Sequence, residues 1–288
     1  MSLRSNKAFT LIELLVVIAI IALLLSILMP TLTKVKKQAQ AAICLSNVKQ
    51  WGSIFTMYAQ DNRNSFPQNF AGNGLREREA YWMAATMPYY QDNDLRFCPS
   101  AKRDKDNPND GWQWQETSDD YGQTFESWGP FGQSNPDIWY DQFDEGGYGM
   151  NEWCSNPPLG IPDMWGLTDL HLMWRKTINI TRANNVPLFM DCKCVDGYPR
   201  DSDPPPTDSE EHDGYVTQSI KMFCMDRHTG GINGVFVDAS ARKVFLKELW
   251  KLKWHKQFDT NGPWTKAGGS DRATWETAAP WMTKYKDF

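Results

Sequence analysis

The chain has 288 residues and a formal net charge of −5, which fits one large domain or two small ones. The negative balance gives no electrostatic reason to expect nucleic acid as a partner. The mean hydropathy of −0.57 is typical of a soluble protein, but the average hides one very apolar segment near the N-terminus. Fourteen tryptophans indicate either a packed, loop-rich body or an adhesive surface.

The apolar segment covers residues 9–29 and contains only three polar positions. As a helix it would extend roughly 30 Å, the thickness of the hydrocarbon core of a bilayer. Arg4 and Lys7 precede it without any acidic residue, which predicts a cytoplasmic N-terminus. A secretory signal peptide would have a shorter apolar region followed by a small-residue cleavage site, whereas this segment leads into Pro30 and a helical pattern.

Glu13 is the most informative residue of this segment. A carboxylate inside an apolar helix is costly and requires a partner or a function. A plain single-span membrane anchor gains nothing from such a residue. Glu13 therefore indicates that the helix has a role beyond anchoring.

The stretch Lys7–Leu15, with the sequence KAFTLIELL, resembles the signal of type IV pilins and type II secretion pseudopilins. The resemblance implies that a prepilin peptidase cuts between Ala8 and Phe9 and methylates the new amine. The family usually carries glycine before the cut, where this chain has Ala8. Pro30 falls where pilins often carry a helix-kinking proline.

The resemblance implies a non-enzymatic subunit of a type IV pilus-like or type II secretion pseudopilus filament. Its partners would be further copies in a helical homo-oligomer, other pilins or pseudopilins, the prepilin peptidase and an inner-membrane assembly platform. We expect Glu13 to pair with the Phe9 amine of a neighbouring subunit and so set the axial register. The chain would span the inner membrane once before assembly and join a periplasmic or extracellular filament afterwards.

Beyond Pro30 the pattern changes from wholly apolar to amphipathic. Apolar residues recur at three- and four-residue steps and then stop at the turn-rich Asp61–Asn64. This pattern predicts one long helix from Phe9 to Asp61, in which Gly52 costs about 1 kcal/mol relative to alanine. The expected organisation is a leader peptide (1–8), a transmembrane and filament-core helix (9–30), an amphipathic stalk helix (31–64) and a globular head (65–288).

The resemblance, together with the elements expected in the head, implies an α+β, pilin-like fold, with the long helix packed on a small antiparallel sheet with large loop insertions. Residues 187–191 form a predicted strand, and residues 234–238 and 242–246 form the clearest hairpin. The remaining expected elements are a short helix or buried turn at 81–90, a short helix at 248–258, an irregular insertion at 100–147 and an exposed acidic loop at 201–213.

Four segments of the head resemble recurring parts of large bacterial pilin-like proteins. They are CLSNVKQ from Cys44, FCPS from Phe97, YGMN from Tyr148 and RHTGG from Arg227. His228 and Asp238 match the family's H-x9-D-G element, except that Ala239 stands in place of the glycine.

We interpret the turn at residues 227–231 as structural. His228 would hydrogen-bond a strand end or Asp238, while Gly230 and Gly231 would supply unusual backbone angles. Catalysis is the alternative, because Asp191, Asp226 and Asp238 are candidates for orienting His228. No motif supplies a nucleophile for it, so no catalytic residue is expected.

The six cysteines are disulfide candidates, because a head outside the cytoplasmic membrane permits oxidation. We favour pairing Cys44 with Cys98, since Phe97-Cys98 resembles a strand end that returns to the stalk. Cys192 and Cys194 would share a strand face, so each is expected to find a distant partner, Cys154 or Cys224. A zinc site in the head is the alternative use of these residues.

No cofactor is required, but calcium is the chemical alternative. Candidate oxygen ligands cluster in two acidic segments, one formed by Asp104, Asp106, Asn109 and Asp110 and the other by residues 201–213. Neither segment matches the EF-hand loop pattern, and a solvated acidic loop is the preferred interpretation of both.

Two functional alternatives stay open. The large head favours a minor, tip-located pseudopilin that primes assembly. A membrane-tethered module would instead use exposed tryptophans to hold a polysaccharide, for which Trp250 and Trp254, four residues apart, are candidates together with Trp264, Trp275 and Trp281. Packing of these tryptophans within the head or between subunits is the preferred interpretation.

Overall fold

The structure is a computed structural model that describes residues 11–69, 81–101, 122–129, 145–164, 166–211 and 219–287. The chain divides into two compact units, Met1–Gln40 and Ala41–Phe288. Helix α1 (Leu11–Asp61) contributes to both units, because its residues from Ala41 onward belong to the second.

Helix α1 follows the predicted long helix and is 51 residues long. Its apolar part is long and apolar enough to cross a membrane, and no residue of its most apolar stretch is buried. Pro30 lies inside the helix and has no N–H to donate to the preceding turn. The hydroxyls of Thr31 and Thr33 donate to carbonyls one turn earlier, at 2.7 and 3.0 Å, and the helix continues through the proline.

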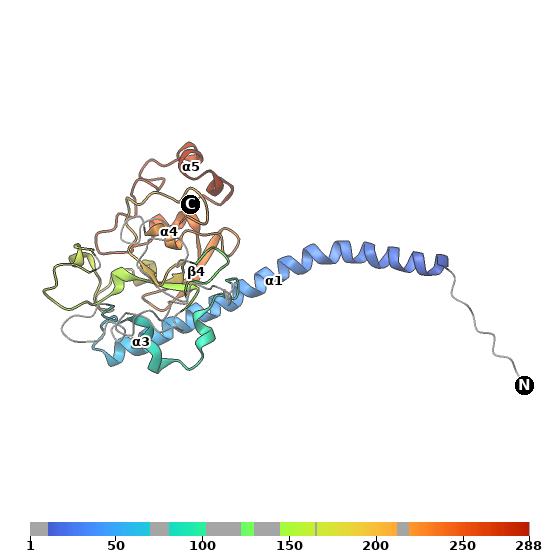
Figure 1. Ribbon diagram of the computed structural model, residues 1–288. Coiled ribbons are helices and arrows are strands. Elements are labelled where there is room, and N and C mark those ends of the chain that lie inside the picture. The colour runs from blue at the N-terminus through green and yellow to red at the C-terminus, as the bar shows by residue number, and fades with distance from the viewer. Residues whose placement is uncertain are drawn as a thin grey trace, which may run out of the picture. The chain divides into compact units, whose positions relative to one another are not determined.

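The second unit contains a five-stranded sheet in the order β3-β1-β2-β4-β5 (Figure 1). Its strands are β1 (Tyr148–Asn151), β2 (Pro187–Asp191), β3 (Asp196–Gly197), β4 (Gly231–Phe236) and β5 (Ala241–Phe245). Strand β3 runs parallel to β1, while the other pairs are antiparallel. The predicted α+β, pilin-like fold is confirmed, but the sheet is mixed rather than wholly antiparallel.

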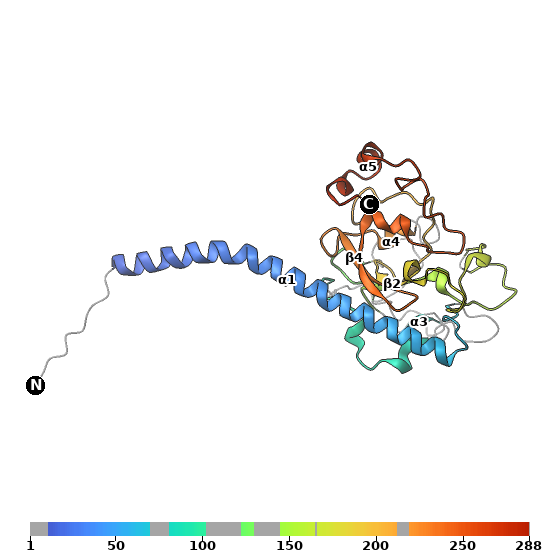
Figure 2. The ribbon, with the colours of Figure 1, turned by 180° about the vertical axis from the view of Figure 1, so that it is seen from behind.

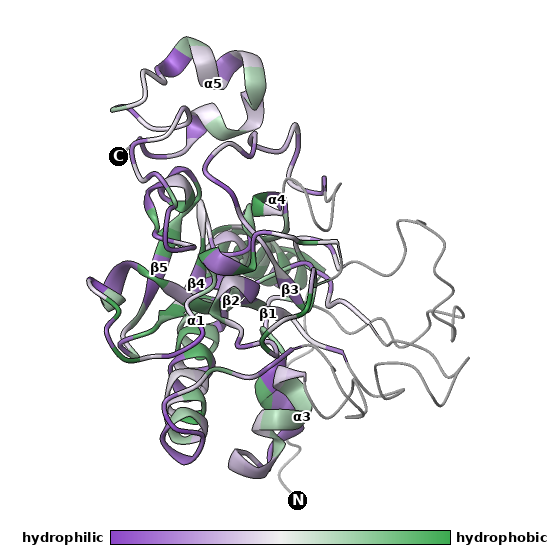
Figure 3. Cartoon of the chain, turned by 90° about the vertical axis from the view of Figure 1, so that its left-hand side faces the viewer, coloured by the Kyte–Doolittle hydropathy of each residue, from purple (hydrophilic) through white to green (hydrophobic). Residues whose placement is uncertain are grey.

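Aromatic residues join the second part of α1 to the central strand β2. The ring centroid of Trp51 lies 4.9 Å from that of Phe189 on β2 and 5.4 Å from that of Trp82 on α3 (Trp82–Thr86). Both views of the ribbon place this part of α1 against β2 and β4 (Figures 1 and 2). Hydrophobic and hydrophilic residues are mixed along the strands and along α1 (Figure 3).

The remaining elements are short, and most are single turns of 3-10 helix. They are η1 (Met87–Tyr89), η2 (Asn93–Arg96), η3 (Glu152–Cys154), η4 (Leu170–Leu172), η5 (Ala183–Asn185), α4 (Ile220–Phe223), η6 (Leu246–Lys251), α5 (Arg272–Ala278) and η7 (Pro280–Lys284). The predicted helix at 81–90 is present as α3 and η1. The helix predicted at 248–258 is wrong beyond Lys251, because Leu252 is extended and ends η6.

The C-terminal tryptophans pack within the second unit. The indole of Trp250 donates to the carbonyl of Asp203 at 2.8 Å, and that of Trp281 donates to the carbonyl of Pro206 at 2.9 Å. The predicted exposed loop at 201–213 is therefore partly wrong, since the backbone around Asp203 and Pro206 is covered by these rings. The tryptophans exposed by 3% or less in this region are Trp250, Trp254 and Trp275.

Candidate functional site

Four buried polar side chains from four separate segments converge in the second unit. Cys44 lies on α1, Cys98 follows η2, Asp191 ends β2 and His228 lies in the turn before β4. One donor atom of each lies within 4.8 Å of the donor atoms of the other three. We name these four residues the buried donor cluster.

The donor atoms within the cluster are in direct contact. The Sγ atom of Cys44 donates to Asp191 at 3.4 Å from Oδ2, and Cys98 Sγ lies 3.4 Å from Nε2 of His228. The same His228 Nε2 lies 3.1 Å from Oδ2 of Asp191. Asp191 is therefore the centre of the cluster and contacts both a thiol and the imidazole.

The backbone and Arg227 fix the Asp191 carboxylate. The backbone N–H of Asn233 on β4 donates to Oδ2 at 2.8 Å, and Arg227 donates to Oδ1 at 3.3 Å. The same guanidinium donates to the carbonyls of Gly147 at 2.5 Å and Thr124 at 2.7 Å. A buried carboxylate with several N–H donors is held both in place and in its ionised form.

The charges of the cluster shift the pKa values of its members. Burial opposes ionisation of Asp191, but the positive charges of His228 and Arg227 and the N–H of Asn233 lower its pKa to about 2. Burial likewise opposes protonation of His228, yet the Asp191 carboxylate raises its pKa to about 9. Burial raises the pKa of Cys98, while the hydrogen bonds from Cys44 and His228 outweigh this and lower it to about 7. One thiol of the cluster is thus ready to ionise near neutral pH.

In the turn before β4, His228 takes the first of its two predicted partners, a strand end. His228 pairs with Asp191 at the end of β2, while Asp238 instead accepts from the Ser240 N–H at 2.9 Å. Gly230 has a positive φ of 84°. Position 231 requires glycine for a steric reason: an added Cβ would lie 2.3 Å from the carbonyl oxygen of Val244.

All six cysteines are buried free thiols in the structure. Cys192 and Cys194 follow β2 in a turn and do not share a strand face as the sequence predicts; the N–H of Cys194 lies 3.4 Å from Cys192 Sγ. Cys154 Sγ faces the carbonyl of Pro187, and Cys224 Sγ faces the sulfur of Met282. The Cys44–Cys98 disulfide stays a prediction, and the structure brings these two sulfurs within 4.8 Å.

The calcium candidates are not brought together in the described residues. Asp104, Asp106, Asn109 and Asp110 lie outside them. In the second acidic segment, Asp208 accepts the N–H groups of Glu210 and Glu211 at 2.7 and 2.9 Å, and Asp203 accepts that of Arg200 at 3.0 Å. These carboxylates cap their own loop, which explains the local acidic composition without an ion.

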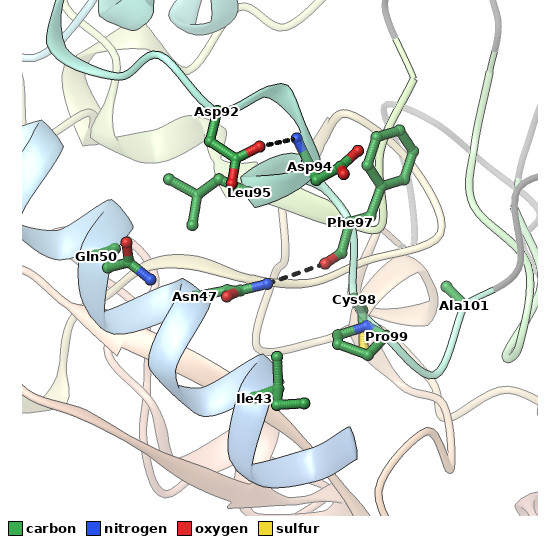
Figure 4. A pocket seen from close by; sticks show the side chains of 10 residues that line it. All are labelled: Ile43, Asn47, Gln50, Asp92, Asp94, Leu95, Phe97, Cys98, Pro99 and Ala101. Atoms are coloured by element: carbon green, nitrogen blue, oxygen red, sulfur yellow. Dashed lines mark hydrogen bonds between the residues drawn. The ribbon is translucent and has the colours of Figure 1, made fainter. Parts of the chain in front are cut away.

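A pocket of about 710 Å³ lies beside α1. Figure 4 shows that Ile43, Asn47 and Gln50 form its helical side, facing the chain that follows η2. The Asn47 amide donates to the carbonyl of Phe97 at 3.1 Å, and Cys98 is one of the lining residues. The buried donor cluster is thus adjacent to a pocket on the surface of the unit.

The first part of α1 offers a different kind of site. The large apolar side chains from Leu11 to Val35 are exposed, and Glu13 lies among them in the first described turn. Ala8 and Phe9, the predicted processing residues, lie outside the described residues. Residues 3–29 match the family model of the prokaryotic N-terminal methylation motif.

The chain carries a prepilin-type N-terminal methylation motif. It is also similar to the type IV wide pilus major component PilA4 of Thermus thermophilus, with 42% identity over 69 residues. That match covers 24% of this chain and 52% of PilA4, so the chain spans about half the length of the curated relative it matches. No solved structure matches the chain.

Proposed function

We propose that the chain is a structural subunit that polymerises through the first part of α1 into a filament of the type IV pilus or type II secretion pseudopilus class. One observation carries this proposal. A helix with a prepilin-type methylation motif leaves every large apolar side chain from Leu11 to Met29 exposed. An apolar surface of this extent requires lipid or other protein chains around it.

The two states of the subunit differ in what covers this surface. Before assembly, lipid surrounds residues 9–30 and the chain spans the inner membrane once. After removal of residues 1–8 by a prepilin peptidase, the helices of other subunits replace the lipid, with an inner-membrane platform driving the exchange. PilA4, which is similar to this chain over 69 residues, is named as a major pilus component, and this supports the same class of assembly here.

The second unit supports a structural role for the head. Its His228–Asp191 pair is closed to substrates, since both residues are at most 4% exposed. The polysaccharide-binding alternative has weaker support, because Trp250, Trp254 and Trp275 are buried. The size of the unit Ala41–Phe288 instead favours a minor or specialised subunit over the simplest shaft subunit.

The test is electron microscopy of filaments sheared from the native cell, combined with mass spectrometry of their N-termini. Abundant chains that begin at methylated Phe9 would establish a processed shaft subunit. Trace amounts with the same N-terminus would establish a minor subunit. Chains with an intact N-terminus that occur only in the membrane fraction would overturn the filament proposal.

A further inference from the structure

Three donor–donor distances in the buried donor cluster are close to those around a tetrahedral metal ion, and all four donor atoms lie within 4.8 Å of one another. Zinc binds sulfur at about 2.3 Å and nitrogen or oxygen at about 2.0–2.2 Å, so neighbouring donors in a tetrahedron lie roughly 3.3–3.8 Å apart. The contacts in the cluster are 3.4 Å between Cys98 and His228, 3.4 Å between Cys44 and Asp191 and 3.1 Å between His228 and Asp191. Small movements would bring all four donors to one ion.

We propose that the buried donor cluster binds one divalent transition-metal ion, Zn²⁺ by its ligand chemistry, as a closed structural site. Two thiolates and an imidazole select soft and borderline metals over calcium or magnesium. All four ligands come from the protein and all are buried, so no position is left open for a substrate. This inference goes beyond filament assembly and does not depend on it.

The charges around the cluster balance when the ion is present. With His228 neutral, two thiolates and one carboxylate carry three negative charges, and Zn²⁺ reduces this to one. The buried Arg227 guanidinium, 3.3 Å from the Asp191 carboxylate, supplies the compensating positive charge. A buried site without net charge avoids most of the desolvation penalty of an isolated ion.

Backbone hydrogen bonds hold two of the ligand residues in place. The ligating carboxylate of Asp191 receives the N–H of Asn233 at 2.8 Å, and the backbone N–H of His228 donates to the Gly231 carbonyl at 2.9 Å. Such outer contacts orient ligands and raise metal affinity. Cys44 and Asp191 lie on α1 and the central strand, two rigid elements.

A disulfide between Cys44 and Cys98 is the competing state of the same two sulfurs. It would engage two of the four side chains and leave His228 and Asp191 as a separate buried pair. The metal uses all four and accounts for their convergence from segments far apart in the sequence. Bound metal would join α1, the chain after η2, β2 and the turn before β4 at one point.

The test uses the full-length chain purified in detergent under reducing conditions, then passed into metal-free buffer and analysed by mass spectrometry of its metal content. We expect about one zinc ion per chain. Reconstitution with Co²⁺ should give the strong visible absorption of a tetrahedral thiolate site. The Cys98→Ser variant should lose the zinc, while the matched control Cys154→Ser, another buried cysteine, should retain it.

Two results would overturn the proposal. The first is reduced wild-type protein that takes up neither Zn²⁺ nor Co²⁺, accompanied by a Cys44–Cys98 disulfide in the protein isolated from the cell envelope. The second is equal loss of zinc from Cys98→Ser and Cys154→Ser, which would place the ion elsewhere. The cobalt spectrum needs only the wild-type chain, so it decides the question even where a variant fails to fold. None of these measurements depends on whether the chain forms filaments.

Discussion

His255 is a buried titratable residue outside the cluster. Its ring lies 4.8 Å from that of Trp153 and 5.3 Å from that of Phe258, measured between centroids. Burial, together with the cations of Lys253 and Arg200, lowers the pKa of His255 to about 4. The unfolded chain has a histidine pKa of about 6.5 and therefore binds more protons between about pH 4 and pH 6.5.

Stability should consequently fall as the pH is lowered through this range. Above the unfolded-state pKa the histidine is neutral in both states, and the fold keeps its full stability. As the pH falls toward the folded-state pKa, only the unfolded chain binds the proton, and the free energy of unfolding decreases. We expect His255 to account for a loss on the order of 2 kcal/mol between about pH 7 and pH 4. Urea unfolding followed by tryptophan fluorescence measures it. The His255→Phe variant should lose less stability than the wild type over this pH range. An equal loss would contradict the assignment of the effect to His255. The control is His171→Phe, at an exposed position.

Ala239 adopts a left-handed backbone conformation, with φ of 62°, in the turn between β4 and β5. This conformation costs an alanine about 1–2 kcal/mol, whereas glycine adopts it freely. The greater entropy of glycine in the unfolded chain offsets about half of this gain. Glycine is also what the resembling H-x9-D-G element carries at this position.

The Ala239→Gly variant should therefore be more stable than the wild type by about 0.5–1 kcal/mol. Equilibrium urea unfolding measures the change. Ala273→Gly, an exposed position in helix α5, provides the matched control and should be destabilising by about 1 kcal/mol. Destabilisation at both positions would show that the turn at Ala239 is not strained.

At the scale of elements, Gly52 has low helix propensity but lies where helix α1 packs closely against another element. Helix propensity alone marks it as a weak point. In the structure it faces β4, and an added Cβ would lie 2.6 Å from a methyl group of Val235 and 3.5 Å from Ala239. The glycine permits α1 to approach the hairpin closely.

The Gly52→Ala variant should accordingly lose stability. The gain in helix propensity is about 1 kcal/mol, but overpacking of a tight contact costs roughly 1–3 kcal/mol. We expect a net loss of about 1 kcal/mol and a lower thermal midpoint by circular dichroism. Ser53→Ala, the next and exposed position of the same helix, should gain a few tenths of a kcal/mol. A stabilised Gly52→Ala would mean that the hairpin shifts freely.

The elements predicted correctly are those whose pattern is local. Helix α1 and the β4–β5 hairpin follow from periodicity and turn residues within one stretch of sequence. Strand β1 has no such signal, because its four residues gain strand character from pairing with β2 and β3. Gly149 illustrates this: an added Cβ would lie 2.5 Å from the carbonyl oxygen of Cys194, a contact that no local pattern reveals.

The cluster was only partly accessible to sequence reasoning. The FCPS segment suggested that Cys98 returns to Cys44, and Asp191 was a candidate for orienting His228. Their common meeting point depends on the order of strands, in which β2 and β4 are neighbours. The fully buried Arg227 was missed, since a lone arginine in a sequence resembles any solvated cation.

At the scale of the whole molecule, the two units have opposite surface chemistry. Large apolar side chains are exposed along the first part of α1, while most of those described in the second unit form one extensive core, with Leu159 among the exceptions. The apolar surface of the first unit therefore requires lipid or other protein chains to cover it. Glu13 is the acidic residue of the apolar stretch, and within packed helices its carboxylate needs a positive partner.

Replacing Glu13 separates membrane insertion from assembly. Glu13→Val makes the helix more apolar and should leave the chain in the membrane fraction, because removing a buried charge favours insertion. If Glu13 pairs with the Phe9 amine of a neighbouring subunit, as we expect, the variant should reduce sheared filaments at least about tenfold, because leaving that amine buried without its partner typically costs about 3–5 kcal/mol. Immunoblots of membrane and sheared fractions measure both effects.

The matched control is Glu13→Asp, which keeps the charge and shortens the side chain by one methylene. It should assemble better than Glu13→Val if the ion pair sets the register, because a shorter carboxylate can still approach the amine. Normal filaments from Glu13→Val would show that packing of the apolar surface suffices and that Glu13 has another role. Equal loss in both variants would mean that side-chain length, rather than charge, controls the contact between subunits.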